Sequence, residues 1–310
     1  MWNKLLDASI FFSFDRSGYL RHEGQFDETL DFKKGSRALI TGGTSGIGKA
    51  TALEMVRQGV DVVITGRNLQ RGNELSAHNS HLTFKELDLS EWSGFDPLVR
   101  EIEPLDHLVL NAGSMPEKFT TNREGVELQF ASQLFGHYLL AHKLLAAGKL
   151  KAGARVVWVT SGGMYLKVLD LKTIFNNPRY DKVDQYANVK RAQVTLLPFF
   201  QKEFPQQTVI AMHPGWAETP GVDESLPGFA KMMKGRLRTP LQGADTILWA
   251  LSTKKSIASG ALYFDREKVN PHKFFFTRKS EKSGKELQEL LSKITLTVEG
   301  EATSGESGKR

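Results

Sequence analysis

Tyr186 and Lys190 are the two residues whose types and spacing suggest chemistry most directly. They lie four positions apart in a predicted helix, so their side chains share one helix face. A lysine ammonium beside a phenol favours the phenolate, which would let Tyr186 exchange a proton nearer neutral pH than an ordinary pKa of about 10 allows. A lone Tyr-x-x-x-Lys pair is usually a plain surface pair. The chemical interpretation therefore needs support from other residues.

That support comes from a glycine turn that could hold a phosphate. Gly42, Gly46 and Gly48 follow a short apolar run at 38–40 and precede a helical pattern. A strand that leads through glycines into a helix brings free N–H groups and the positive end of the helix dipole to one place. The spacing is G-x-x-x-G-x-G, not the common G-x-G-x-x-G, and an ordinary strand-to-helix turn with extra glycine is the alternative. With Ser161 at the end of another predicted strand, the turn makes Tyr186 and Lys190 candidates for catalysis.

The elements that must position these residues alternate along the chain. This alternation predicts an α/β fold: a Rossmann-like, doubly wound, mostly parallel seven-stranded sheet with helices on both faces. Ligands bind beyond the carboxyl ends of such strands, and the candidate residues directly follow them. The predicted strands are 38–41, 61–65, 82–87, 107–111, 155–160, 208–212 and 261–264, and the predicted helices are 48–58, 92–102, 123–150, 183–204, 240–251 and 281–294.

Taken together, these motifs resemble the classical short-chain dehydrogenase/reductase family, in its retinol-dehydrogenase-like branch. The resemblance covers about residues 35–265. It implies an NAD(P)-dependent oxidoreductase that interconverts alcohol and carbonyl groups. The 25 positions from Ser161 to Tyr186 exceed the spacing in the most compact members. The matching segments are T-G-G-T-S-G-I-G at 41–48, N-A-G at 111–113, Ser161, Y-A-N-V-K at 186–190 and P-G at 214–215.

The resemblance also implies a role for each residue. Tyr186 would be the general acid/base, Ser161 would hydrogen-bond the reacting oxygen, and Lys190 would bind the nicotinamide ribose. Gln133 replaces the family's catalytic asparagine, which holds a water that links the lysine to solvent. The longer glutamine predicts a working but slowed proton relay, so that Gln133→Asn would raise turnover. The cofactor would contact Tyr186 and Lys190 as well as Gly42, Thr44, Ser45, Gly46, Ile47, Gly48, Arg67, Asp88, Leu89, Asn111, Ala112, Gly113, Pro214, Gly215 and Thr219.

Two features bear on specificity. No acidic residue ends the second predicted strand, and Arg67 follows it, which favours NADP(H) over NAD(H) because a guanidinium can fork onto a 2′-phosphate. Trp216 and Phe229 lie in the segment 214–238, which covers the substrate in this family. Apolar side chains there favour a lipophilic carbonyl or alcohol. Simple packing of these side chains on the sheet is the alternative.

Two other function classes deserve comparison. A nucleotide-binding scaffold or redox sensor with little turnover would keep the cofactor motifs, and the replacement at Gln133 favours it. Sugar epimerisation or dehydration is disfavoured, because the related enzymes carry T-G-x-x-G-x-x-G and position 45 here is Ser45.

Outside the main domain at 35–265, the sequence predicts a helical N-terminal extension at 1–34, a C-terminal extension with a helix at 266–298 and a disordered tail at 299–310. Trp2, Leu5 and Leu6 follow helical spacing. They fit a helix packed on the domain or a weak anchor at a membrane surface.

Composition limits the remaining possibilities. The chain has a net charge of +6 and no cysteine, which excludes disulfides, zinc-thiolate sites and cysteine nucleophiles. We expect no metal site. No recognition motif accompanies the basic residues, so we expect no nucleic-acid partner. The sequence predicts a cytoplasmic protein, membrane-associated if the N-terminal segment is an anchor. By resemblance, a homodimer would form through the long helices near 123–150 and 183–204.

Overall fold

The computed structural model of the chain describes residues 10–177 and 179–307. Its centre is one sheet of order β3-β2-β1-β4-β5-β6-β7-β8. All neighbouring strands are parallel except β8, which runs antiparallel to β7. The predicted Rossmann-like fold is confirmed, with one more strand than the seven predicted. The strands are β1 (Arg37–Thr41), β2 (Asp61–Gly66), β3 (Leu82–Glu86), β4 (Leu105–Leu110), β5 (Leu150–Val159), β6 (Thr208–Met212), β7 (Leu262–Phe264) and β8 (Glu267–Val269).

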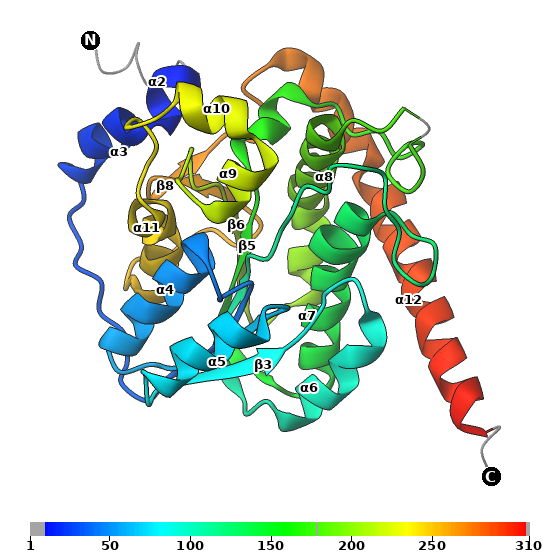
Figure 1. Cartoon of the computed structure of the whole chain (residues 1–310). Helices are drawn as coiled ribbons and strands as arrows, with labels where there is room; N and C mark the ends of the chain where they lie inside the picture. Colours follow the sequence, from blue (N-terminus) through cyan, green and yellow to red (C-terminus); the bar gives the residue numbers. More distant parts are fainter. Residues whose placement is uncertain (1–9, 178, 308–310) are drawn as a thin grey trace.

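Helices cover both faces of the sheet, which Figure 1 shows nearly edge-on. One layer holds α4 (Gly46–Arg57), α5 (Leu69–Ala77) and α11 (Pro240–Ser252), and the other holds α6 (Phe95–Glu101), α7 (His137–Ala146) and α8 (Lys182–Glu203). The side chains of each strand alternate between the two resulting cores. In β5, Trp158 packs in the core under α7 and α8, and Val157 packs in the core under α11. The strands read as continuous apolar runs because both of their faces are buried.

Several helical segments differ from the sequence prediction, among them two in the layers that cover the sheet. The helix α5 was not predicted, and it forms because Asn68 caps it, with its Oδ1 accepting a hydrogen bond from the Arg71 N–H at 2.9 Å. The predicted helix at 123–150 is shorter in the structure. It begins with a π-helical turn, Phe130–Gly136, and continues as α7 to Ala146.

The extra strand β8 belongs to a tight hairpin with β7. Its two turn residues, Asp265 and Arg266, have φ values of 47° and 65°, which non-glycine residues adopt only at a cost. Ion pairs hold both: Asp265 with Arg238 at 2.5 Å, and Arg266 with Asp245 at 2.6 Å. The turn is stabilised by distant residues rather than by a glycine, so the local sequence carries no hairpin signal.

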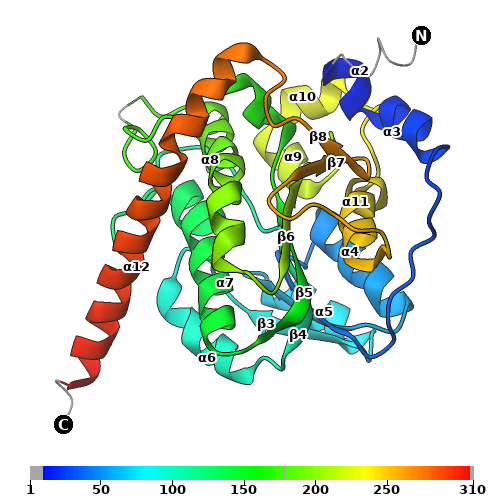
Figure 2. The same ribbon diagram turned by 180° about the vertical axis from the view of Figure 1, so that it is seen from behind.

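The C-terminal extension packs along α8 (Figure 2). A 3₁₀ segment, Phe275–Ser283, leads into α12 (Gly284–Ser307). Leu287 and Leu291 of α12 are fully buried. The helix continues to Ser307, whereas the sequence predicted disorder from residue 299. Once the packed first turns have formed, each further residue extends the helix cheaply.

The N-terminal extension packs on the domain as two short helices, α2 (Ile10–Phe14) and α3 (Arg16–Glu23). Both lie beside α10 in the two views of the molecule (Figures 1 and 2). The predicted helical pattern at Trp2, Leu5 and Leu6 lies outside the described residues. Within the described ranges, no helix is both long and apolar enough to cross a membrane.

Candidate active site

A cleft opens at the carboxyl ends of the central strands, where the sequence predicted a ligand. Fifteen of the predicted cofactor residues line it. The cleft wall also contains residues that the sequence analysis missed, because they lie near the motifs and match no motif themselves: Ser114, Met115, Leu128, Ser132 and Val222. The predicted residues in the wall are Gly42, Thr44, Ser45, Gly46, Ile47, Arg67, Asp88, Leu89, Asn111, Ala112, Gly113, Tyr186, Lys190, Pro214 and Thr219.

The glycine turn has the geometry of a phosphate cradle. Gly42 and Gly46 have φ values of 67° and 54°, which glycine adopts without strain. A Cβ on Gly48 would lie 2.4 Å from the Gly42 carbonyl oxygen, so only glycine lets α4 start this close to β1. Ser45 makes no side-chain hydrogen bond to the first turn of α4. The N–H groups of that turn therefore suit the pyrophosphate of a dinucleotide.

A buried polar network fixes this turn to the end of β4. Thr41 Oγ1 accepts hydrogen bonds from the backbone N–H groups of Asn111 and Ala112, at 2.9 and 3.2 Å. The Asn111 amide donates to the carbonyl oxygens of Thr41 and Gly42, at 3.0 and 3.3 Å. Asn111 therefore shapes the cofactor wall by bracing the glycine turn.

His137 completes this network, and sequence reasoning missed it. Its Nδ1 lies 3.0 Å from the Gln133 carbonyl oxygen, and its Nε2 lies 2.9 Å from Thr41 Oγ1. Burial lowers the pKa of His137 to about 3, so the ring is neutral. Because a carbonyl can only accept, Nδ1 carries the proton and Nε2 accepts from the Thr41 hydroxyl. No local pattern marks this residue; its role follows from the fold.

Tyr186, Ser161 and Lys190 meet at the inner end of the cleft. The Ser161 hydroxyl lies near enough to the Tyr186 phenol to lower its pKa, and Lys190 Nζ lies 5.3 Å from the centre of the Tyr186 ring. Lys190 Nζ also donates to the Val159 carbonyl oxygen at 3.1 Å. The structure therefore brings the three predicted residues together, although Ser161 itself is not part of the cleft wall.

The electrostatics differ from the sequence prediction. Burial raises the pKa of Tyr186, and the nearby Ser161 hydroxyl offsets this only in part. Burial also lowers the pKa of Lys190 to about 7. The expectation that the lysine charge would dominate was wrong, because desolvation is the larger effect for both groups. A tyrosine with a raised pKa is protonated at neutral pH, which suits a proton donor.

Gln133 lies on the π-helical turn and is fully buried. Its Nε2 donates to the Ser114 carbonyl oxygen at 2.7 Å. A Cβ on Gly113 would lie 2.7 Å from Gln133 Oε1, so the amide packs directly under the loop that follows β4. The backbone carbonyl of Gln133 accepts from Gln193 Nε2 at 2.8 Å. In this structure the Nε2 end of the side chain contacts the cofactor wall, and Oε1 is buried without a hydrogen-bond partner among the described residues.

At the outer end of the cleft, Arg67 and Asp88 face each other. Arg67 Nη1 lies 3.8 Å from Asp88 Oδ2, and the arginine side chain is 62% exposed. The other Asp88 oxygen accepts from the Ser90 N–H and hydroxyl, at 2.9 and 2.7 Å. Asp88 is thereby held in place, and Arg67 keeps enough exposure to meet an anionic group.

The predicted substrate residues lie beside the cleft. Trp216 and Phe229 pack edge to face, with ring centres 5.2 Å apart, and neither belongs to the cleft wall. Gly215 is also outside the wall; a Cβ there would lie 2.6 Å from Arg238 Nε. Thr219 does line the cleft, and it caps α9 (Pro220–Ser225) by accepting from the Val222 N–H at 3.2 Å.

The short chain dehydrogenase family model matches residues 36–227 of this chain. Human dehydrogenase/reductase SDR family member 12 is 34% identical over 273 residues, which are 84% of this chain and 86% of that protein. This chain is a short-chain dehydrogenase/reductase. It falls in the retinol-dehydrogenase-like branch of these oxidoreductases: mouse retinol dehydrogenase 14 is 29% identical, with 79% of this chain and 81% of that protein covered.

A solved structure of a short chain dehydrogenase/reductase family protein superposes with a TM-score of 0.61. It is 27% identical and covers 74% of this chain and 95% of that chain. The region shared with these relatives holds the glycine turn, Ser161 and the Tyr186–Lys190 pair. Cofactors of the NAD(P)(H) type belong to this family, and the cradle described above fits their pyrophosphate.

Proposed function

We propose that this short-chain dehydrogenase/reductase is an NADP-dependent enzyme that interconverts a carbonyl and an alcohol on a lipophilic small molecule, with Tyr186 as general acid/base. The observation that carries the proposal is that Tyr186 and Lys190 line the same cleft as the glycine cradle, with Ser161 beside the Tyr186 phenol. The bound nicotinamide would supply or accept the hydride. The chain's own residues would handle the proton.

In the reducing direction, Tyr186 would donate its phenolic proton to the substrate oxygen. Its raised pKa keeps that proton in place at neutral pH. Ser161 lies beside the Tyr186 phenol and would hold the phenolic hydroxyl and the substrate oxygen in line. Lys190, buried with a pKa near 7, would gain its charge when an anionic cofactor or phenolate is close, and would stabilise the phenolate that remains.

The preference for NADP(H) rests on Arg67. Arg67 follows β2 and stands at the outer end of the cleft. A carboxylate at this place would accept from a ribose 2′-hydroxyl and repel a 2′-phosphate. A guanidinium instead favours the phosphate. For the substrate, Trp216, Phe229 and Met232 flank the cleft on the side of α9 and offer an apolar approach, which favours a lipophilic molecule.

Tyr186→Phe tests the proposed acid/base role. The variant keeps the ring and loses only the transferable proton, so NADPH-dependent turnover should fall by a factor of about 10² to 10⁴. The Kd for NADPH, measured by fluorescence titration, should change less than about threefold. Lys190→Ala should weaken both turnover and NADPH binding. A Tyr186→Phe protein that keeps most of its activity would remove Tyr186 from the mechanism.

A second candidate is a low-turnover NADP-binding scaffold or redox sensor. The observation that favours it is the side chain of Gln133, whose amide is hydrogen-bonded to the Ser114 carbonyl oxygen. Such a protein would bind NADPH and reduce none of a broad panel of carbonyls. The same titration and turnover assay distinguishes the two functions.

We also propose where the molecule resides and how it pairs. A cytoplasmic protein that contacts a membrane weakly through its N-terminal extension would suit a lipophilic substrate, and exposed Phe12 would take part. A homodimer through α7 and α8 would have to accommodate α12, because Leu287 and Leu291 already cover part of α8. Vesicle flotation and sedimentation equilibrium test these two proposals separately.

A further inference from the structure

The segment between β6 and α11 forms a loop that is closed at its base. We call residues 216–238 the cleft loop. Its ends are bonded to each other: the Arg238 N–H donates to the Trp216 carbonyl oxygen and the Glu218 N–H to the Arg238 carbonyl oxygen, both at 2.8 Å. Between them lie α9 and α10 (Pro227–Met232). Four residues of this loop, Thr219, Gly221, Val222 and Ser225, line the cleft.

The N-terminal extension is hydrogen-bonded to the base of the cleft loop. The Trp216 N–H donates to the Phe14 carbonyl oxygen, and the Arg16 N–H donates to the Arg236 carbonyl oxygen, both at 2.8 Å. Asp15 and the Arg236 guanidinium form an ion pair at 2.7 Å. Residues 14–16 therefore hold both ends of the cleft loop at once.

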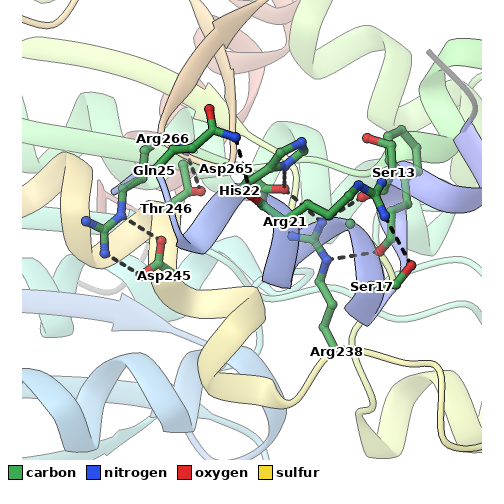
Figure 3. Close-up of polar contacts among 12 residues, drawn as sticks. Ser13, Ser17, Arg21, His22, Gln25, Arg238, Asp245, Thr246, Asp265 and Arg266 are labelled. Carbon is green, nitrogen blue, oxygen red and sulfur yellow. Dashed lines mark hydrogen bonds and ion pairs between the residues drawn. The ribbon is translucent and has the colours of Figure 1, made fainter. Parts of the chain in front are cut away.

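A buried guanidinium fixes the three segments. Arg238 is 1% exposed, and its Nε and Nη2 donate to the carbonyl oxygens of Phe14 and Ser13, at 3.0 and 2.9 Å. The same guanidinium binds both carboxylate oxygens of Asp265, at 2.5 and 2.9 Å. His22 Nδ1 also lies 2.7 Å from Asp265 Oδ2, the oxygen that Arg238 Nη2 binds (Figure 3). The charge is thus paired, and all three guanidinium nitrogens donate hydrogen bonds, as a buried arginine requires.

The extension also reaches the chain next to the catalytic serine. Phe14 is fully buried. A Cβ on Gly162 would lie 2.3 Å from its ring, so the ring occupies the space beside the residue that follows Ser161. The Phe14 ring centre is 5.9 Å from that of Trp216. One side chain of the extension therefore contacts both the loop after β5 and the start of the cleft loop.

We propose that residues 13–16 help to form the substrate site by holding the cleft loop in place. Arg238 is a positioning residue, which fixes this loop over the substrate site. The inference rests on the proposed function, because it assigns the substrate to the side of the cleft that this loop flanks. The cofactor's adenosine end is expected near Arg67 and Asp88, which lie in the opposite part of the cleft wall. Loosening the loop should therefore affect substrate binding more than cofactor binding.

The test compares Arg238→Lys with Phe14→Leu, and uses Arg57→Lys on the surface of α4 as the matched control. The lysine keeps the charge and loses the fork to Ser13, Phe14 and Asp265. Trypsin cleavage after Lys231 and Lys234, both exposed in the cleft loop, should be at least fivefold faster in native Arg238→Lys protein. The KM for any accepted carbonyl should rise about tenfold, with kcat within about threefold and the Kd for NADPH within about threefold of the parent.

Phe14→Leu should shift the same quantities in the same direction and by less, and it keeps the inference testable if Arg238→Lys does not fold. Cleavage rates and KM equal to those of the parent in the folded variants would overturn the inference. So would an equal loss of NADPH and substrate binding, which marks general destabilisation. If the parent reduces no carbonyl, the proposed function fails, and the trypsin comparison still decides whether the extension fixes the loop.

Discussion

At the scale of single residues, the proposed preference for NADP(H) depends on Arg67. Its guanidinium is largely exposed, and its distance of 3.8 Å from Asp88 is too long for a strong hydrogen bond. A surface pair of this kind contributes little, so the arginine can turn to a 2′-phosphate at small cost. The Asp88 carboxylate, held by Ser90, can in turn meet the adenosine.

Arg67→Asp should therefore reverse the preference. A hydrogen bond to a charged group contributes about 1.5–3 kcal/mol, so the Kd for NADPH should rise at least about tenfold while the Kd for NADH falls. Fluorescence titration with both cofactors measures this. Arg100→Asp, an exposed arginine on α6, is the matched control and should change neither value. Tighter binding of NADH than NADPH by the parent would contradict the assignment.

At the scale of elements, the π-helical turn Phe130–Gly136 links the long helical layer to the cofactor wall. Such turns insert one residue into a helix and often lie at functional sites. Here the turn delivers Gln133 under the loop at 113–114, where its amide holds the Ser114 carbonyl oxygen at 2.7 Å. The resemblance to the family implied a proton-relay role for this residue, and its contact with Ser114 indicates a second role, the support of the cofactor wall.

Gln133→Asn distinguishes these two roles. An asparagine is shorter by about 1.5 Å, one C–C bond, and would leave the Ser114 carbonyl unpaired. From the contacts we expect the Kd for NADPH to rise up to about fivefold, for roughly 1 kcal/mol, with turnover falling at every pH. From the relay role the sequence predicted a higher turnover with little change in cofactor affinity. The turnover rate and the Kd for NADPH, measured across pH for the parent and for Gln133→Asn, show which role is right.

The sequence predicts an element well when the residues that stabilise it are close to one another in the chain. The strands and the glycine turn were predictable because buried apolar runs and glycines are local signals. The β7–β8 turn was not, because Arg238 and Asp245 stabilise Asp265 and Arg266 from a distance. The roles of His137 and Arg238 were equally hidden, since both depend on backbone carbonyls brought together only by the fold.

At the scale of the whole molecule, three buried neutral histidines make stability depend on pH. Burial lowers the pKa of His107 to about 4, and those of His137 and His213 to about 3. In the unfolded chain each titrates near 6.5. Unfolding therefore takes up protons below that pH. The stabilisation is fully present above about pH 6.5 and is lost as the pH falls toward 4.

We expect the free energy of unfolding to be lower at pH 5.5 than at pH 7.5, with each histidine contributing a slope of up to about 1.4 kcal/mol per pH unit once it is protonated in the unfolded chain. Glu127, whose pKa burial raises, acts in the opposite direction but is a single group. Urea denaturation at the two pH values measures the difference. The His213 and Phe264 rings are stacked with their centres 4.1 Å apart, so His213→Phe should keep the packing and reduce the slope. Lys190, whose pKa burial lowers to about 7, adds to the slope in both proteins. Equal stability at both pH values would contradict the neutral, buried histidines.

In the proposed function, a hydride is transferred between the cofactor and a substrate bound in this cleft, and Tyr186 supplies the accompanying proton. The most direct measurement is mass spectrometry of the products after a panel of lipophilic aldehydes and ketones is incubated with NADPH deuterated at C4 of the nicotinamide. With the parent protein we expect an alcohol that carries one deuterium. With Tyr186→Phe, which should still bind NADPH, we expect at most about a hundredth of that amount of deuterated alcohol. A parent protein that binds NADPH and transfers no deuterium to any member of the panel would contradict the proposed function.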